Sequence, residues 1–315
     1  MRLWVQCATN FSEGRNQEHI QKIIEPLQNK AGFHIASLDS DPDYHRSVVT
    51  LIGDIEAMYR PLLQYVDRAL ECIDMEHHQG QHFRMGAVDV IPFVPLLDTP
   101  ISKIETITHL FGRDLGEKMP VYYYAHSTKN VLRKRLPDIR RGGYEGLKLR
   151  IRDPLWTPDE GYPDDLLHRG AVALGVRDSL IAYNISLNTI DIKAAHALAK
   201  QIRETSGGLP HVQASAVYLE SRHRCQVTIN LLNYVETPLH LVFETVKALA
   251  PTYGVKVKSS ELIGLMPLAL LDQTAYFYED KHMALSVQDK LKIVQENLML
   301  ENFSVDKIIE SHLPL

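Results

Sequence analysis

The chain has 315 residues, of which 45% are hydrophobic and 23% charged, a balance typical of a globular protein and unlike that of a disordered one. The formal net charge is −5 and the basic residues are scattered, which argues against a nucleic-acid partner. No run approaches the ~20 apolar residues that a membrane-spanning helix needs, which argues against a membrane protein.

The first part of the chain predicts elements in the order strand, helix, strand, strand, helix, strand. Apolar and β-branched runs mark the strands, and apolar residues at helical spacing mark the helices. The predicted ranges are 3–8, 16–28, 33–38, 47–52, 55–72 and 88–96. Because Pro92 and Pro95 donate no backbone hydrogen bond, we expect the last strand to be irregular or to lie at a sheet edge.

The loop Asn10–Asn16 follows the first strand and opens the first helix. Backbone N–H groups at such a junction, with Arg15 beside them, can receive a carboxylate or a phosphate. Asn10 and Arg15 are therefore candidate binding residues. The alternative is that Asn10 or Ser12 only caps the helix.

An acidic turn, Asp39–Asp43, joins the next two strands and precedes His45 and Arg46. Its three carboxylates could hold a hard cation, but their spacing lacks the glycine and the distal glutamate of an EF-hand loop. Solvated turn acids are the alternative. Asp39, at the end of its strand, is the carboxylate best placed to point into a cleft.

The segment 74–90 is the main candidate for chemistry, because three histidines, an arginine and two glycines crowd a stretch too broken for a regular helix. Imidazole titrates near neutral pH, so His82, beside Arg84, is a candidate general acid or base. His78 and His82 have the i, i+4 spacing of a metal-binding pair, but Gly80 interrupts that helix and no nearby glutamate completes a zinc motif. We therefore expect catalysis without a metal. A solvated histidine-rich turn is the alternative.

The middle of the chain predicts helices over 101–118 and 130–140 and an extended segment over 121–125. Residues 141–175 lose regular periodicity. Long irregular segments in compact proteins are usually lids, binding loops or disordered linkers. The aromatic residues of this one argue against a linker.

The second part of the chain repeats the order of elements of the first. The predicted ranges are 180–187, 192–204, 214–219, 226–232, 238–253 and 255–263. Two β-α-β-β-α-β units in tandem indicate an α+β fold of two ferredoxin-like subdomains. A length above the ~100 to 200 residues usual for one domain agrees with this. We place the subdomains at 1–179 and 180–315 and expect a substrate cleft between their sheets.

Asn184 lies inside an otherwise apolar strand of the second part. A buried amide must find hydrogen-bond partners. Asn184 therefore either bonds a neighbouring loop for structural reasons or contacts a ligand.

The cysteines Cys7, Cys72 and Cys225 are widely spaced and form no Cys-x-x-Cys pair. Their number and spacing argue against a disulfide framework or a cysteine zinc site. We expect a cytoplasmic protein, since the first residues also lack the apolar core of a signal peptide.

Several stretches of the chain resemble the glutamate formiminotransferase family, folate-dependent enzymes that also form the amino-terminal part of formiminotransferase-cyclodeaminase. They occur in the order of the family and span nearly the whole chain. The matching stretches are Cys7–Asn16, Ile73–Met75, Gly80–Pro95, Gly143–Leu147, Trp156–Asp159, Ile181–Ile185 and Glu261–Pro267.

The resemblance implies two subdomains with facing mixed sheets and a folate-binding tunnel between them. It implies transfer of a formimino group from N-formiminoglutamate to N5 of tetrahydrofolate, within histidine degradation and one-carbon metabolism. The catalytic histidine of the family falls on His82. Its folate-binding segment falls on Gly161, Tyr162, Pro163, Asp164, Asp165, Leu166, Leu167, His168, Arg169 and Gly170. Since the chain ends at Leu315, no cyclodeaminase activity is expected.

The implied reaction needs a group that takes a proton from N5 and gives one to the leaving amine, which suits His82. The amidinium of the substrate is cationic, so a facing carboxylate would orient it. Asp39 is our candidate for that role.

Both substrates carry carboxylates, which forked guanidinium donors bind well. The candidate donors are Arg15, Arg46, Arg84 and Arg177. The pterin needs a flat apolar slot with a few amide partners, to which the segment 161–170 and Asn184 could contribute.

The chain departs from the family beside His82, where Gln81 and Phe83 replace the usual glutamate and proline. Losing the acid removes a charge beside the imidazole, and losing the proline frees the backbone. His45 also stands where an asparagine is common. These departures keep two alternatives open. One is an enzyme that uses 5-formyltetrahydrofolate, for formyl transfer to glutamate or ATP-dependent cyclisation, and the other is a folate-binding paralogue without chemistry.

The expected partners are small molecules, formiminoglutamate and tetrahydrofolate. A metal-dependent hydrolase is a third alternative function. A homodimer is plausible from the family, and the apolar positions Phe303, Val305, Ile308 and Ile309 can pack either inward or on a partner.

Overall fold

The computed structural model describes residues 2–81, 83–166, 168–280 and 284–314. The chain divides into two compact units, Met1–Asp178 and Ser179–Leu315. Each unit combines a sheet with helices, so the predicted α+β class with two tandem subdomains is confirmed. The tunnel between them stays a prediction. Among the described residues, no helix is both long and apolar enough to cross a membrane.

The first unit begins with the predicted β-α-β-β-α-β order. Its strands are β1 (Trp4–Phe11), β2 (Phe33–Asp41), β3 (Arg46–Asp54), β4 (Val88–Pro95), β5 (Val121–Tyr123) and β6 (Val172–Val176). Its α-helices are α1 (Gln17–Ile24), α2 (Ile55–Cys72), α3 (Ile101–Gly116), α4 (Leu136–Ile139) and α5 (Gly143–Arg150). Short 3₁₀ helices are η1 (Glu25–Leu27), η2 (Ala125–Ser127), η3 (Val131–Arg133), η4 (Pro154–Trp156) and η5 (Pro163–Leu166). The sheet order β2-β3-β1-β4-β6-β5 is ferredoxin-like over β1 to β4, and β6 and β5 extend it as parallel strands.

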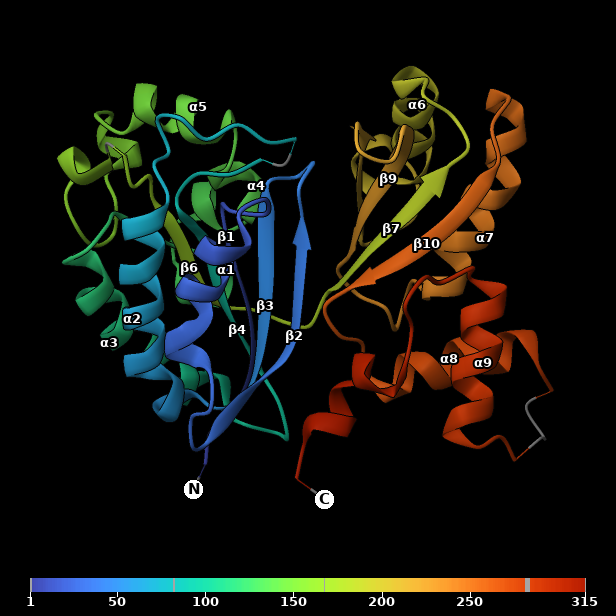
Figure 1. Cartoon of the computed structure of the whole chain (residues 1–315), viewed down its shortest axis with the longest axis horizontal. Helices are drawn as coiled ribbons and strands as arrows, with labels where there is room; N and C mark the ends of the chain where they lie inside the picture. The colour runs from blue at the N-terminus through green and yellow to red at the C-terminus, as the bar shows by residue number, and fades with distance from the viewer. Residues whose placement is uncertain (1, 82, 167, 281–283, 315) are drawn as a thin grey trace. The chain divides into compact units, whose positions relative to one another are not determined.

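Helices α1, α2 and α3 pack on one face of this sheet (Figure 1). Thr9 points to that face, because its Oγ1 lies 3.3 Å from the hydroxyl of Tyr65 in α2. Side chains alternate along a strand, so Asn10 points the other way. Strand pairing places Val48 opposite Asn10 and Asp39 opposite Val48, which puts Asp39 on the same face as Asn10. We call the face that carries Asn10 and Asp39 the opposite face.

The second unit repeats the ferredoxin-like arrangement. Its strands are β7 (Ile181–Leu187), β8 (Val212–Leu219), β9 (Arg224–Leu231) and β10 (Val257–Ile263), and its α-helices are α6 (Ile192–Ile202), α7 (Leu239–Leu249), α8 (Leu268–Tyr278) and α9 (Val287–Asn297). Short 3₁₀ helices are η6 (Glu204–Ser206), η7 (Ala250–Tyr253), η8 (Val305–Lys307) and η9 (Ile309–His312). The sheet order is β10-β7-β9-β8, and α6 and α7 bury their apolar sides in the core of the unit (Figure 1).

For the strand with two prolines, of the two expected outcomes, an edge position or an irregular strand, the structure shows the second. β4 lies inside the sheet, between β1 and β6. Its register pairs Val94 with Gln6 and next pairs Val90 with Asn10, so the ladder to β1 skips Pro92. The missing N–H of Pro92 is tolerated because the ladder is interrupted there, which agrees with the expected irregularity.

Besides the short helices η4 and η5, an α-helix and a strand form in the stretch for which periodicity predicted no regular structure. α5 contains Gly143 and Gly146, which weaken helix propensity, but its Tyr144 and Leu147 are buried in the core. β6 is a short apolar run that is buried throughout, as parallel strands usually are. Burial, more than periodicity, explains why both elements form.

The apolar positions near the C-terminus mostly pack inward. Phe303 and Ile308 join the hydrophobic core of the second unit. Ile309 is buried and Val305 is exposed. These residues therefore give no separate support for a homodimer, which stays a prediction.

Candidate functional site

Segments of the first unit that are far apart in sequence meet through backbone hydrogen bonds. They are the β1–α1 loop (10–16), the β2–β3 turn (41–46), the histidine loop (74–87) and the segment 161–170. The Ser12 N–H donates to the Ala87 carbonyl at 2.8 Å, and the Ser12 hydroxyl donates to the Gly86 carbonyl at 2.9 Å. The first loop is thereby joined to the histidine loop.

The histidine loop also lies against the β2–β3 turn. The Gln81 N–H donates to the Asp43 carbonyl at 3.1 Å. A Cβ atom on Gly80 would lie 2.4 Å from the carbonyl oxygen of Tyr44, so this close approach requires glycine.

The segment 161–170 runs beside the histidine loop. The Met75 N–H donates to the His168 carbonyl and the Ala87 N–H to the Arg169 carbonyl, both at 2.8 Å. Asp74 adds a side-chain contact, with its Oδ1 3.0 Å from His168 Nδ1. The fold therefore brings together the two stretches that the family resemblance assigns to catalysis and to folate.

The catalytic candidate His82 lies outside the described residues, as does Leu167. Within the described part of the same loop, His77 is largely exposed and its Nδ1 lies 3.0 Å from Asp74 Oδ2. Among the described residues, no group of three or more His, Cys, Asp or Glu side chains is arranged to hold a metal ion.

His78 is buried, and its hydrogen bonds define its tautomer. Arg84 Nε donates to His78 Nδ1 at 3.0 Å, so Nε2 carries the proton and donates to the His45 carbonyl at 3.0 Å. Burial lowers the pKa of His78 to about 4. The ring is therefore neutral near pH 7 and serves as a structural link.

Arg84, a predicted carboxylate binder, is engaged within the protein. Its Nη1 and Nη2 donate to the two carboxylate oxygens of Glu145 at 3.0 and 2.8 Å, and Nη2 also donates to the His78 carbonyl at 2.8 Å. This forked pair connects the histidine loop to α5. Substrate binding by Arg84 stays a prediction.

Glu13, in the β1–α1 loop, is a site residue that the sequence reasoning missed. Its Oε1 accepts the N–H groups of Arg15 and Asn16 at 2.8 and 3.0 Å and lies 3.2 Å from His45 Nε2. Burial alone would raise the pKa of Glu13, but the hydrogen bonds from His45 and the backbone outweigh it and lower the pKa to about 2. An acid just before a helix, where it can accept backbone N–H groups, was the available signal.

Glu13→Gln is expected to remove a pH-dependent part of the stability. The folded-state pKa of about 2 lies below the ordinary value of 4.5, so the contribution is complete above pH 4.5 and is lost as the pH falls toward 2. Urea unfolding of the parent and the variant should therefore differ most at neutral pH and converge near pH 2. A difference that is independent of pH would contradict this role.

Asp89, inside β4, was also missed. It is buried, its Oδ1 accepts the Met85 N–H at 2.9 Å, and its Oδ2 pairs with the Arg140 guanidinium. Asp89 thus fixes the end of the histidine loop where β4 begins. A charged residue within the apolar run Val88–Pro95 was the signal for it, since buried charges are nearly always paired.

The predicted catalytic residue Asp39 shares the opposite face of the sheet with two predicted binding residues, Asn10 and Arg46. Asn10 and Asp39 flank Val48 there, and Arg46 lies two residues before Val48 on the same strand. Asn10 is 7% exposed, and its Oδ1 has no hydrogen-bond partner in the described part of the chain. Burial lowers the pKa of Arg46 to about 10.

Arg15 is exposed and Arg177 is half-buried. Arg15 Nε donates to the Pro42 carbonyl at 2.9 Å, and Arg177 Nη1 donates to the Asp178 carbonyl at 2.7 Å. Tyr162 is 74% exposed and directly precedes η5.

Asn184 belongs to a polar network of the second unit. Its Nδ2 donates to Glu261 Oε1 at 3.2 Å, and Gln226 Nε2 donates to the same oxygen at 2.8 Å. Arg222 Nη1 donates to Glu261 Oε2 at 3.3 Å. The partner of Asn184 is thus a neighbouring strand instead of a loop, and a ligand contact stays a prediction.

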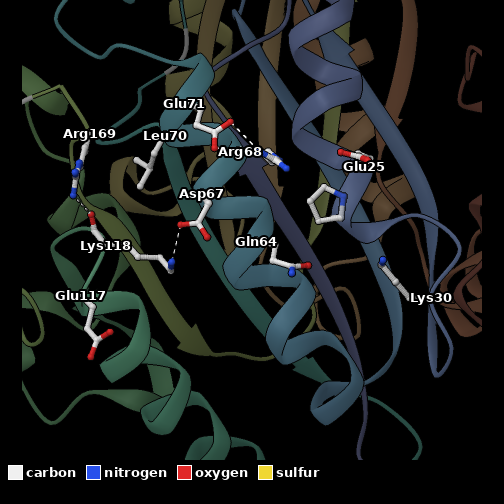
Figure 2. A pocket seen from close by; sticks show the side chains of 11 residues that line it. Glu25, Lys30, Gln64, Asp67, Arg68, Leu70, Glu71, Glu117, Lys118 and Arg169 are labelled. Carbon is white, nitrogen blue, oxygen red and sulfur yellow. Dashed lines mark hydrogen bonds and ion pairs between the residues drawn. The ribbon is translucent and has the colours of Figure 1, made fainter.

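A charged hollow of about 720 Å³ lies among the end of α1, the exposed side of α2 and the chain after α3 (Figure 2). Four of its charged residues form two ion pairs, Lys118 with Asp67 at 2.6 Å and Arg68 with Glu71 at 3.1 Å. Arg169 donates to the Lys118 carbonyl at its rim. Since helices form its walls and the opposite face lies elsewhere, we do not assign the substrates to it.

The chain matches a known family in both units. The family described as "Formiminotransferase domain, N-terminal subdomain" matches residues 4–177, and "Formiminotransferase domain" matches residues 182–313. The chain is 36% identical over 316 residues to "Glutamate formimidoyltransferase" of Streptococcus pyogenes serotype M1, covering 98% of each chain. It is 37% identical over 280 residues to the protein of that name from Thermoplasma acidophilum, covering 87% of this chain and 92% of the relative. It is 37% identical over 310 residues to "Formimidoyltransferase-cyclodeaminase" of Gallus gallus, covering 95% of this chain and 57% of the relative.

Proposed function

Because the chain belongs to the formiminotransferase family of transferases, we propose that it transfers a formimino group from N-formiminoglutamate to N5 of tetrahydrofolate. The products are 5-formiminotetrahydrofolate and glutamate. The observation that carries this proposal is the match of both family domains, in tandem, to the two units of the fold. A relative named glutamate formimidoyltransferase, aligned over 98% of the chain, adds support.

His82 is proposed as the general acid and base. N5 of tetrahydrofolate attacks the amidine carbon and loses a proton, and the amine of departing glutamate gains one, so a single imidazole can move both protons. The other histidines of the loop support the choice. His78 is neutral and tied to Arg84, and His77 is exposed beside Asp74.

Asp39 is proposed to face the cationic amidinium and to stabilise positive charge in the tetrahedral intermediate. Its place beside Asn10 on the opposite face supports this role. Asn10 is suited to accept a ligand N–H, because its buried Oδ1 has no partner in the described residues and such groups are rare. Arg15, Arg46 and Arg177 are proposed for the substrate carboxylates, and the segment 161–170 with Asn184 for the pterin.

Asp39→Asn is expected to lower kcat/KM for formiminoglutamate by about 10- to 100-fold, the usual loss for one charged hydrogen bond. Initial rates at varied formiminoglutamate would measure it. Asp43→Asn is the matched control, because it removes the same charge from the neighbouring turn. Equal losses in both variants would reduce the role of Asp39 to a general charge effect.

The proposed function is tested by incubating the protein with formiminoglutamate and tetrahydrofolate and following the 5,10-methenyltetrahydrofolate derived from the product. Parallel reactions contain 5-formyltetrahydrofolate with glutamate, or 5-formyltetrahydrofolate with ATP. Turnover only from a formyl donor would reject the proposal in favour of 5-formyltetrahydrofolate chemistry. Folate binding without turnover from any donor would indicate a folate-binding paralogue.

A further inference from the structure

His45 occupies an unusual place between the loops of the first unit. It lies in the β2–β3 turn, directly before β3, with a backbone φ of +51°. Its side chain points inward, with 16% exposure. Its Nδ1 lies 2.8 Å from the Gln79 carbonyl oxygen and its Nε2 lies 3.2 Å from Glu13 Oε1. The ring therefore connects the histidine loop to the β1–α1 loop.

The histidine loop contacts His45 at two more points. The rings of His45 and His78 stack with centroids 4.3 Å apart and planes 17° from parallel. His78 Nε2 donates to the backbone carbonyl of His45 at 3.0 Å. Since His78 in turn accepts from Arg84, which pairs with Glu145, these contacts form one continuous chain of side chains from Glu13 to α5.

We propose that His45 is a positioning residue, whose ring holds the part of the histidine loop around His78 and Gln79 against the β1–α1 loop. The expected effect on catalysis rests on the proposed function, whereas the contacts of His45 are independent of it. Asp39 and His45 belong to the same β2–β3 hairpin, and Gln79 is close in sequence to the proposed catalytic residue His82. One ring therefore joins the hairpin that carries Asp39 to the described part of the loop, and a loss of this contact is expected to cost turnover.

The second unit supplies a matched position. His223 lies directly before β9, as His45 lies directly before β3, and has a φ of +46°. Each is followed by an arginine. His223 Nδ1 lies 3.3 Å from the hydroxyl of Tyr218, within its own hairpin. Substitution at His223 therefore reproduces the backbone effect of substitution at His45 without touching the histidine loop.

The test compares His45→Gly, His45→Asn and His223→Gly in the full chain. Glycine accepts the positive φ without strain, so loss of the ring is separated from loss of the turn. We expect His45→Gly to lower kcat by about 10- to 100-fold with KM changed less than kcat, because a misplaced catalytic group costs turnover more than binding. Asparagine tolerates a positive φ and carries a side-chain N–H donor, so His45→Asn should have a higher kcat than His45→Gly. His223→Gly should match the parent.

Hydrogen exchange of residues 74–87 gives a second readout that does not need activity. Faster exchange in this loop for His45→Gly, with His223→Gly like the parent, is expected. If the parent shows no formimino transfer but the loop still loosens, the proposed function fails and the positioning contact stands. Unchanged exchange in His45→Gly, or a loss of kcat no larger than in His223→Gly, would overturn the inference.

Discussion

Replacing His82 with alanine is expected to lower kcat for formimino transfer by about 100-fold while leaving tetrahydrofolate affinity near that of the parent. The reaction moves one proton away from N5 and one toward the departing amine, and alanine can do neither. The pH dependence of kcat should flatten near neutral pH, where imidazole titrates. Steady-state kinetics and equilibrium binding of tetrahydrofolate, measured on the same preparation, separate turnover from affinity.

His77→Ala is the matched control, since it removes an imidazole from the same loop at a side chain that is 85% exposed. It should leave kcat close to that of the parent. Unchanged turnover in His82→Ala would reject the proposed general acid and base. A parallel loss of folate affinity would assign His82 to binding instead.

Asp89→Ala is expected to lower the free energy of unfolding of the first unit by about 3–5 kcal/mol. The substitution leaves the Arg140 guanidinium without its buried carboxylate partner and the Met85 N–H without its acceptor. An unpaired charge lowers the free energy of unfolding far more when it is buried than when it is exposed to solvent. Urea unfolding followed by a probe in the first unit would measure the loss, because two units need not unfold in a single transition.

Two controls accompany Asp89→Ala: a variant that breaks an exposed ion pair, and a double variant that also removes the charge of Arg140. Arg68→Ala breaks the ion pair between Arg68 and Glu71, two side chains that are both substantially exposed. This variant should leave the unfolding midpoint nearly unchanged. Arg140→Met in the Asp89→Ala background should restore part of the lost stability, because it removes the unpaired charge. A loss of less than about 1 kcal/mol in Asp89→Ala would show that the pair is solvated and does not hold the loop.

The sequence predicted the elements of the fold wherever their signals are local. The helix α2 begins and ends at the predicted residues, because apolar side chains recur at helical spacing and Asp54 caps its first turn. Local signals were insufficient where contacts with strands distant in sequence decide the position of an element. The prolines of β4 left open whether the strand lies at an edge or is irregular, and the structure shows an interrupted ladder to β1 with Pro92 inside the sheet.

The site was predicted as a set of segments, not as a set of contacts. Residue types and loop positions pointed to the loop around His82, and family resemblance added the segment 161–170, which lies beside it. The pairing of Glu13 with His45 joins residues that are 32 positions apart. Periodicity describes only near neighbours in sequence, so such pairs need the fold. For the same reason Arg84 was predicted to bind substrate, although most of its donors contact Glu145 and His78.

Main-chain groups hold the histidine loop alongside the side-chain contacts of His45, His78 and Arg84. Gln81 and Ala87 donate their N–H groups to carbonyl oxygens of neighbouring segments, and the Ala87 carbonyl accepts the N–H of Ser12. Such bonds do not depend on which side chains the loop carries. Positions of the loop such as Gln81 and Phe83 can therefore differ between relatives while the path of the main chain stays the same. Divergent relatives should accordingly superimpose here more closely than their alignment would suggest.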